Sequence, residues 1–223
     1  MFRIHHEWVA LLAELQVLWI HDENPKRPHA ILTSGLHSNG FFNGGRLLYD
    51  HTRFARELCF DFVDLMVRAA LEPSDITIDR VIGPAYGAIT LADKLADALD
   101  VGSCFALPEG TGSAKKFVLE KRFNIKGKNI LACEDTITTG GSVESVIMCA
   151  ENREDERTGA YVLPIILALC NRSGEEYVGG RKVVAMFDKK MPTWEQRDCP
   201  YCKMGSEPLR AKENWGRLTA NYN

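Results

Sequence analysis

Apolar residues recur at helical spacing in two parts of the chain's first third. Over residues 5–20, positions such as Trp8, Leu12 and Leu15 predict one amphipathic helix. A second helix is predicted over 52–70, where Thr52 suits an N-cap and "EPS" follows as a stop. The stretch 25–46 is rich in Pro, Gly, Ser and Asn, and it predicts a loop with a short extended piece at "GFFNGG".

Strand-like and helix-like segments alternate over the rest of the chain. "DRVIGPA" predicts a strand, "GAITLADKLADAL" a helix and "SCFALP" a further strand. After a polar, lysine-bearing stretch come the strand "NILACE", the turn "DTITTGG", a helix from near Ser142, and the strands "YVLPIILALCNR" and "KVVAMF". This order predicts an α/β fold, with a mainly parallel twisted sheet and helices on both faces. Ligands of such sheets bind at the carboxyl ends of the strands.

Length, charge and hydropathy narrow the class of protein. A chain of 223 residues suits one main domain. Its net charge of -3 shows no basic excess, so we do not expect nucleic acid as a partner. "MFRIHHEWVA" lacks the features of a secretory signal, and the apolar run "AYVLPIILALC" contains a proline and is shorter than the ~20 residues of a membrane helix. We therefore expect a soluble protein without a membrane partner.

The seven cysteines fall into two groups. Five lie in apolar segments, where a reduced thiol behaves as a small hydrophobic group, and this suits the cytoplasm: Cys59, Cys104, Cys133, Cys149 and Cys170. Cys199 and Cys202 form "CPYC", which has the spacing of half a zinc site or of a redox pair. A structural zinc site needs four ligands, yet no second CxxC or nearby histidine pair follows, and all six histidines precede residue 52. Zinc would need distant ligands, so we expect a reduced turn, with zinc as the alternative.

The stretch "ILACEDTITTGGS" at 130–142 combines an apolar strand, two adjacent carboxylates and a run of hydroxyl and glycine residues. Glycines and hydroxyls at a helix amino terminus can hold a phosphate with free N–H groups, here without the lysine of a Walker motif. The adjacent acids repel each other unless hydroxyls or a cation compensate, and a ribose diol beside the phosphate would do so. The alternative is a buried strand that ends in a polar turn.

This stretch resembles the phosphoribosyl pyrophosphate binding motif of type I phosphoribosyltransferases. The resemblance implies that Glu134 and Asp135 hold the ribose hydroxyls. It also implies that the following loop holds the 5′-phosphate: Thr136, Thr138, Thr139, Gly140, Gly141 and Ser142.

Other segments resemble the orotate phosphoribosyltransferases of this family, and together they cover most of residues 30–210. "LTSGLHSNGFFN" is similar to the amino-terminal hood, and "ALCNRSGEE" to a late strand where an arginine meets the orotate carboxylate. "PTWEQRDCPYCKMGSEPL" resembles the tail of a branch with a Cys-Pro-x-Cys turn. "GPAYGAITLADKLADAL" resembles the pyrophosphate loop and its helix, which implies pyrophosphate contacts from Gly83, Pro84, Ala85, Tyr86 and Gly87.

The base site and the lid follow from chemistry together with the resemblance. The fork of Arg172 can pair bidentately with a carboxylate, although it could also be a surface arginine after a strand. Phe41 and Phe42 offer a stacking face or, equally, core packing. Mg²⁺ is expected, held mainly by substrate oxygens. Segment 107–123 is expected to close over the site as a lid that carries Lys115 and Lys116 as catalytic residues beside Asp135. In the family this lid reaches the neighbouring subunit's site, which implies a homodimer with shared active sites.

The chain departs from the family's pattern at several places. Thr33 and Gly87 stand where many orotate enzymes have lysine, Asn171 replaces an aspartate, and segment 107–124 lacks a histidine that better-known members carry. These departures bear on the catalytic residues more than on the fold.

We expect three segments: an N-terminal helix and hood (1–50), a phosphoribosyltransferase core (51–190), and a C-terminal extension with the CPYC turn, packed on core or hood (191–223). The leading hypothesis is Mg²⁺-dependent transfer of phosphoribose from phosphoribosyl pyrophosphate to orotate, which gives orotidine 5′-monophosphate in pyrimidine biosynthesis. The alternatives are transfer to another base, or a regulator that binds phosphoribosyl pyrophosphate without turnover.

Overall fold

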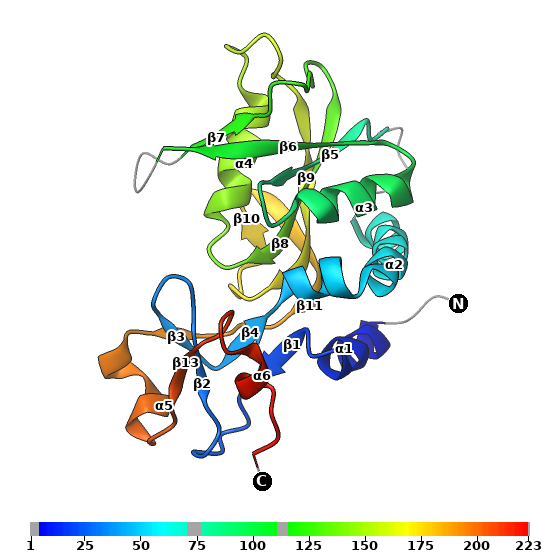
Figure 1. The fold of residues 1–223 in the computed structure, drawn as a ribbon. Helices are drawn as coiled ribbons and strands as arrows, with labels where there is room; N and C mark the ends of the chain where they lie inside the picture. Colours follow the sequence, from blue (N-terminus) through cyan, green and yellow to red (C-terminus); the bar gives the residue numbers. More distant parts are fainter. Residues whose placement is uncertain (1–4, 71–76, 111–115, 223) are drawn as a thin grey trace.

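The computed structural model describes residues 5–70, 77–110 and 116–222. Its upper part in Figure 1 is a twisted seven-stranded sheet with the order β10-β11-β9-β8-β5-β6-β7. The five inner strands are parallel, and β7 and β10 pair antiparallel at the two edges. The strands are β5 (Arg80–Pro84), β6 (Gly102–Glu109), β7 (Lys116–Leu119), β8 (Asn129–Ile137), β9 (Tyr161–Asn171), β10 (Tyr177–Val178) and β11 (Arg181–Asp188).

Successive residues of each inner strand pack on opposite faces of this sheet. In β8, Leu131 and Cys133 join one buried apolar cluster, while Ile130 and Ala132 join another. The first cluster lies under α2 (Thr52–Ala70) and α3 (Ile89–Leu99), and the second under α4 (Gly141–Glu151). Strands with two covered faces read as continuous apolar runs, which explains the sequence pattern. The predicted α/β fold with helices on both faces is confirmed.

A smaller part, here called the hood (residues 18–42 and 192–222), lies below the carboxyl ends of the parallel strands (Figure 1). It contains a two-stranded sheet of β1 (Leu18–Ile20) and β4 (Gly40–Phe42). A second sheet has the order β12-β3-β2-β13, so that the two ends of the chain pair with each other. Its strands are β2 (His29–Ile31), β3 (His37–Ser38), β12 (Thr193–Trp194) and β13 (Pro208–Arg210).

Short helical segments complete the structure. α1 precedes the hood, and the π-helical turn η1 connects the hood to α2. After β12, the chain forms η3 and α5, and α6 lies near the C-terminus. Their bounds are α1 (His5–Glu14), η1 (Arg46–Asp50), η3 (Gln196–Asp198), α5 (Pro200–Lys203) and α6 (Trp215–Leu218).

Some predicted elements differ from the structure. The helix predicted over 5–20 ends at Glu14, because Gln16 adopts a left-handed conformation (φ +54°) and the chain then pairs with β4 as β1. The loop predicted over 25–46 also contains β2 and β3, while the extended piece predicted at "GFFNGG" is confirmed as β4. The polar stretch before β8 contains β7. The helix predicted over 52–70 is confirmed.

In the described part of the chain, no helix combines the length and the apolar character that crossing a bilayer requires.

Candidate active site

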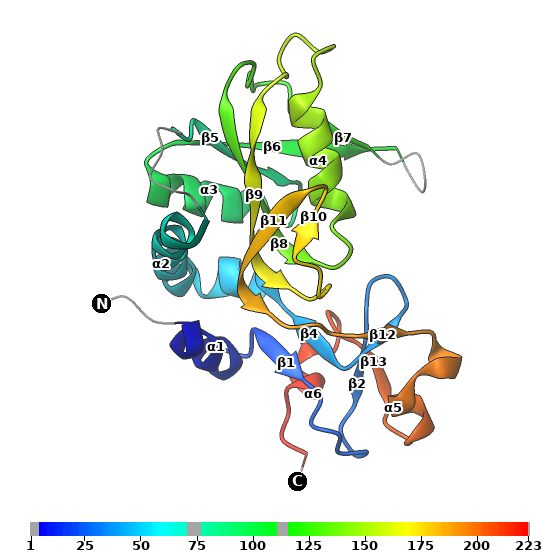
Figure 2. The ribbon, with the colours of Figure 1, turned by 180° about the vertical axis from the view of Figure 1, so that it is seen from behind.

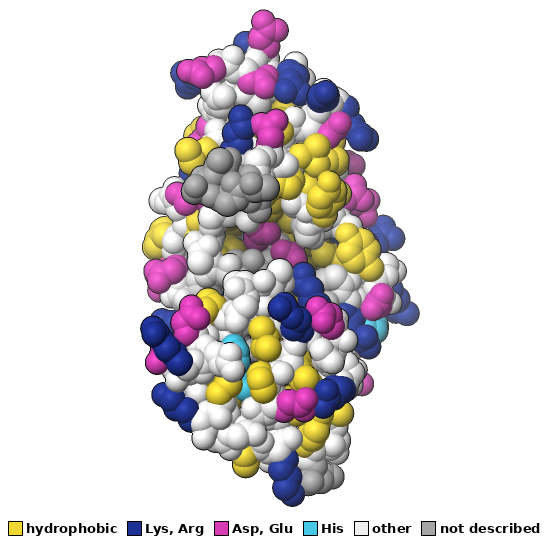
Figure 3. Space-filling view, turned by 60° about the vertical axis from the view of Figure 1, so that its left-hand side comes forward, with side chains coloured by type: hydrophobic (Ala, Val, Ile, Leu, Met, Phe, Trp, Pro, Cys, Tyr) yellow, Lys and Arg dark blue, Asp and Glu magenta, His cyan; other side chains and the backbone are white. Residues whose placement is uncertain are grey.

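A cleft of about 1020 Å³ lies between the hood and the carboxyl ends of the parallel strands. Figure 3 shows the molecule hollowed between its two parts, with acidic side chains in the hollow. Eight of the predicted site residues line the cleft: Phe41, Phe42, Gly87, Asp135, Thr136, Thr138, Thr139 and Arg172. The structure thus brings together residues that lie up to 131 positions apart in the chain, because each belongs to the hood or lies in or just after the carboxyl-terminal part of a parallel strand.

Asp135 lies where three loops meet. Its Oδ1 accepts a hydrogen bond of 2.8 Å from the backbone N–H of Thr136. A Cβ on Gly87 would lie 3.2 Å from both carboxylate oxygens, and a Cβ on Gly44 would lie 3.2 Å from Oδ2. The two glycines therefore let backbone approach the carboxylate closely, which gives a physical reason for glycine at position 87 in this chain.

Glu134 is placed differently from its neighbour. Its side chain is 7% exposed and is not among the cleft-lining residues. Strand β8 continues to Ile137, so the acidic pair lies inside the strand rather than in a turn after it. Adjacent side chains of a strand point to opposite faces, and only one acid of the pair faces the cleft for that reason.

The loop after β8 leads directly into α4. Thr138 and Thr139 are exposed and line the cleft, and the Gly141 N–H lies 3.5 Å from Thr139 Oγ1. Gly140 adopts φ +81°, and a Cβ there would lie 2.5 Å from a methyl carbon of Val178. Gly141 and Ser142 are exposed at the amino terminus of the 11-residue helix, although they do not line the cleft. A helix amino terminus offers unpaired N–H groups to an anion.

The predicted pyrophosphate loop forms the end of β5 and the turn into α3. Gly83 and Pro84 are buried, and a Cβ on Gly83 would lie 2.9 Å from that of Ala88. The Ala85–Tyr86 peptide bond is cis, and Tyr86 is exposed. Gly87 alone among these five residues lines the cleft.

Arg172 is buried at the end of β9 and faces the cleft. Its guanidinium donates to Ser38 Oγ (2.7 Å), to the Met191 carbonyl (3.2 Å) and to the Gly40 carbonyl (3.4 Å). All three partners are uncharged, and no ion pair among the described residues includes Arg172. Burial lowers the pKa of Arg172 from its usual value, but a guanidinium titrates so far above neutrality that it stays charged. The cleft therefore contains a buried cation that forms no ion pair within the described part of the chain.

The two phenylalanines of the hood both line the cleft and are mostly buried. Phe41 is 8% exposed and packs against Trp215, with ring centroids 5.4 Å apart. Phe42 is 5% exposed and belongs to the cluster under α2 and α3. Core packing accounts for most of their surface, and both residues contribute to the lining of the cleft.

The predicted lid forms a hairpin of β6 and β7 at the edge of the main sheet (Figures 1 and 2). Lys116 is exposed and pairs with Glu109 across the hairpin at 3.0 Å. It does not line the cleft of its own chain. Lys115 lies outside the described residues.

Several polar residues that were not predicted as site residues also line the cleft, namely Ser34, Asn43, Tyr49, Ser173, Lys190 and Lys212. Lys190 follows the carboxyl end of β11, so the rule that ligands bind at strand ends would have identified it.

Asn171, which replaces a family aspartate, donates from Nδ2 to the Glu175 carbonyl at 2.9 Å. A carboxylate cannot donate this bond, and the amide therefore suits the turn after β9.

Comparison with known proteins gives consistent matches. The family described as "Phosphoribosyl transferase domain" matches residues 64–184. An orotate phosphoribosyltransferase of Caldicellulosiruptor bescii is 33% identical over 178 residues, which cover 79% of this chain and 84% of that protein. One from Wolinella succinogenes is 34% identical over 198 residues, which cover 82% of this chain and 88% of that protein.

Solved structures agree in fold. The crystal structure of orotate phosphoribosyltransferase from Aeropyrum pernix aligns with a TM-score of 0.57 at 24% identity. The alignment covers 80% of this chain and 92% of that chain.

Gly140→Ala tests whether the turn before α4 requires glycine. The new methyl group would clash with Val178, and alanine is strained at the positive φ of this position. The free energy of unfolding should therefore fall by about 1–3 kcal/mol. Gly141→Ala is the matched control, because its nearest neighbour is Thr139 Oγ1 at 3.7 Å, and it should stay within about 0.5 kcal/mol of wild type. Urea unfolding measures both, and equal losses in the two variants would contradict the assignment.

Proposed function

This chain belongs to the phosphoribosyl transferase family, and we propose that it transfers the phosphoribosyl group of phosphoribosyl pyrophosphate to orotate. The products would be orotidine 5′-monophosphate and pyrophosphate. The observation that carries the base assignment is Arg172, a buried guanidinium that faces the cleft without an anionic partner among the described residues. Orotate is a planar base that carries a carboxylate, and it would supply the missing charge. The similarity to proteins named orotate phosphoribosyltransferase supports the same substrate.

The donor would lie along the ends of β8 and β5. We assign the 5′-phosphate to the loop from Thr138 to Ser142, where hydroxyls and the α4 amino terminus offer donors. Asp135 would bind the ribose hydroxyls from the cleft. Glu134 is assigned to the same hydroxyls as the second acid of the pair, and its burial makes Asp135 the better supported of the two.

The pyrophosphate would face the turn from Gly83 to Gly87, whose backbone can supply N–H donors. Displacement at the ribose C1 carbon develops negative charge on this leaving group, so donors that stabilise it lower the barrier. Mg²⁺ fits this arrangement, because Asp135 lies against Gly87 and its carboxylate is partly exposed. Bound mainly through substrate oxygens and water, the ion would neutralise charge on the pyrophosphate.

Orotate would lie between Arg172 and the edges of Phe41 and Phe42. The guanidinium has five N–H donors, of which the bonds to Ser38, Gly40 and Met191 use three. The remaining donors are available to a carboxylate. The apolar ring edges would pack against the base.

We propose that the lid acts between subunits of a homodimer. The β6–β7 hairpin projects from the side of the sheet, and Lys116 does not line its own chain's cleft. A hairpin from a second copy could bring Lys115 and Lys116 to the pyrophosphate. We propose a cytoplasmic location for this reaction. The reducing cytoplasm also suits the seven free cysteines. Burial raises the pKa of Cys59, Cys104 and Cys170 to about 12, so these three thiols stay protonated.

The direct test is the orotate absorbance of purified protein mixed with orotate, phosphoribosyl pyrophosphate and Mg²⁺. We expect orotate to be consumed only when donor and metal are both present. Asp135→Asn should lower kcat/KM by about 10–150-fold, because a neutral amide accepts weaker hydrogen bonds from the ribose hydroxyls than a charged carboxylate does. Donor binding without orotate consumption would reject this function and favour either another base, to be sought with adenine and hypoxanthine, or a ligand-binding regulator.

Arg172→Lys tests the base site. Lysine keeps the charge but not the planar fork, so kcat/KM for orotate should fall about 30-fold or more, while donor affinity stays unchanged. Ser38→Ala is the control for the hood, because it removes the 2.7 Å contact of Arg172 and leaves the guanidinium intact. If Ser38→Ala reproduces the whole loss, Arg172 acts by holding the hood rather than by binding orotate.

Lys115→Ala and Lys116→Ala test the lid. At least one variant should lower kcat by about 10²-fold with a smaller change in donor affinity, because the lysine would act on charge that develops in the transition state. Lys126→Ala is the control, since this exposed lysine lies before the amino end of β8, whereas the cleft lies at the carboxyl ends of the strands. Steady-state kinetics with calorimetry of the donor measures both quantities, and unchanged rates in both variants remove the lid from the mechanism.

A further inference from the structure

Four side chains of metal-ligand type meet inside the hood. His29 comes from β2, His37 from β3, and Cys199 and Cys202 from the turn that contains α5. One ligand atom of each lies within 4.8 Å of the other three. Three of these residues are buried and Cys202 is partly buried. The histidines are thus the distant ligands that the CPYC turn lacks in sequence.

The spacing of these atoms matches a tetrahedral site. Zinc bonds of ~2.0–2.1 Å to nitrogen and ~2.3 Å to sulfur place nitrogen and sulfur ligands about 3.6 Å apart, and two nitrogens about 3.3 Å apart. His29 Nε2 lies 3.6 Å from Cys199 Sγ and 3.5 Å from Cys202 Sγ. His37 Nδ1 lies 3.3 Å from Cys202 Sγ. The two histidine nitrogens are 2.8 Å apart, so the rings would separate by about half an ångström around an ion.

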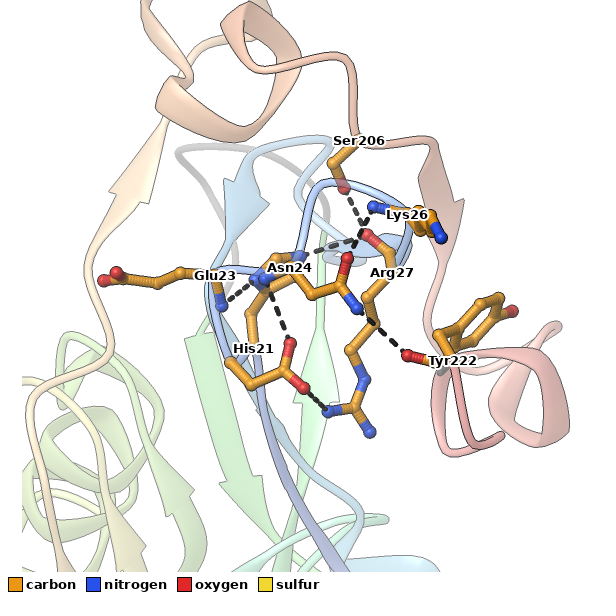
Figure 4. A network of polar contacts seen from close by, with 8 residues as sticks. His21, Glu23, Asn24, Lys26, Arg27, Ser206 and Tyr222 are labelled. Carbon is orange, nitrogen blue, oxygen red and sulfur yellow. Dashed lines mark hydrogen bonds and ion pairs between the residues drawn. The ribbon is translucent and has the colours of Figure 1, made fainter.

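A serine fixes the orientation and tautomer of His29. Ser206 Oγ donates to the Arg27 carbonyl at 2.6 Å, a contact that Figure 4 shows, and it lies 2.9 Å from His29 Nδ1. A carbonyl only accepts, so the hydroxyl proton belongs to that bond and His29 Nδ1 must be the donor to Ser206. The lone pair of His29 is then on Nε2, which faces the other three ligand atoms. Metal-binding histidines are commonly held by such a second hydrogen bond.

Hydrogen bonding can join His29 Nε2 to only one of its three neighbouring ligand atoms at a time. His37 Nδ1 and both sulfur atoms surround His29 Nε2, which has a single lone pair and can accept one hydrogen bond. Buried polar atoms without partners are costly. One cation at the centre would be bound by all four atoms at once.

We propose that His29, His37, Cys199 and Cys202 bind one Zn²⁺ ion in a closed structural site. Two imidazoles and two thiolates in a tetrahedral arrangement form a Cys₂His₂ set, which favours zinc over the harder ions Mg²⁺ and Ca²⁺. All four positions are filled by protein atoms, so the ion has no open position for substrate. This site is separate from the proposed Mg²⁺ site and takes no part in the proposed chemical step.

The zinc site would hold the C-terminal turn against the β2–β3 hairpin. The turn between the two histidine ligands contributes Leu32, Thr33, Ser34 and Leu36 to the lining of the cleft. Loss of the ion would therefore loosen one wall of the cleft as well as the hood.

The test is the metal content of the full chain, expressed without a polyhistidine tag and measured by mass spectrometry of the elements. We expect about one zinc ion per chain. Cys202→Ser is the main variant, because Cys202 is the least buried ligand, and it should lose the zinc. Cys149→Ser, a partly buried cysteine outside the cluster, is the matched control and should keep it, as should Asp135→Asn.

Stability gives a second readout. Chelation of zinc should lower the thermal midpoint by roughly 5–10 °C in the wild type and in Cys149→Ser, and have little effect on Cys202→Ser. Ser206→Ala should weaken Zn²⁺ binding about 10–100-fold in competition with a chromophoric chelator, because His29 loses its orienting partner.

Three results would overturn the proposal. They are a wild-type chain that is free of zinc and does not bind added Zn²⁺, stoichiometric zinc retained in Cys202→Ser, and a stoichiometric iron or nickel ion in its place. None of them depends on orotate turnover, so failure of this site and failure of the transferase reaction are distinguishable.

Discussion

The arrangement of the cleft depends on the contact of the Arg172 guanidinium with the hood. Removing a cation from water costs free energy, and here three uncharged acceptors compensate for part of that cost. Those acceptors belong to β3, β4 and the segment after β11, so one side chain fixes the hood against the end of β9. A bound carboxylate would complete the charge balance. If Arg172 binds the substrate as proposed, substrate binding and hood position are linked through the same group.

The hood cannot rely on a large core of its own. Its buried cluster consists of seven apolar residues, whereas each face of the main sheet has a far larger one. Its second sheet is built from strands of two or three residues, two from each end of the chain. Small domains with limited apolar burial commonly need a metal or a disulfide to be stable. The proposed zinc ion has this role, and it lies where the two ends of the chain meet.

The inner strands of the main sheet could be predicted from local sequence patterns, but the strand pairing of the hood could not. The runs that form β5, β8, β9 and β11 are buried on both faces, and their composition reveals this without knowledge of their partners. The loop between β8 and α4 could also be located from the sequence, because its residues are contiguous, and its role in binding phosphate stays a prediction. By contrast, β2 and β3 pair not only with each other but also with β13 and β12, about 155–180 positions away, and no local pattern encodes these distant pairings. His29 and His37 could not be linked to the CPYC turn for the same reason.

The strand β3 connects the two chemical features of the hood. It has two residues, His37 and Ser38, whose side chains point to opposite faces because neighbours in a strand alternate. His37 faces the cysteines of the C-terminal turn, and Ser38 accepts a hydrogen bond from Arg172. A displacement of β3 on the metal side would therefore shift the acceptor on the cleft side. The proposed zinc ligand His37 and the Arg172 acceptor Ser38 are neighbours in the chain, so a single peptide unit of backbone connects the two.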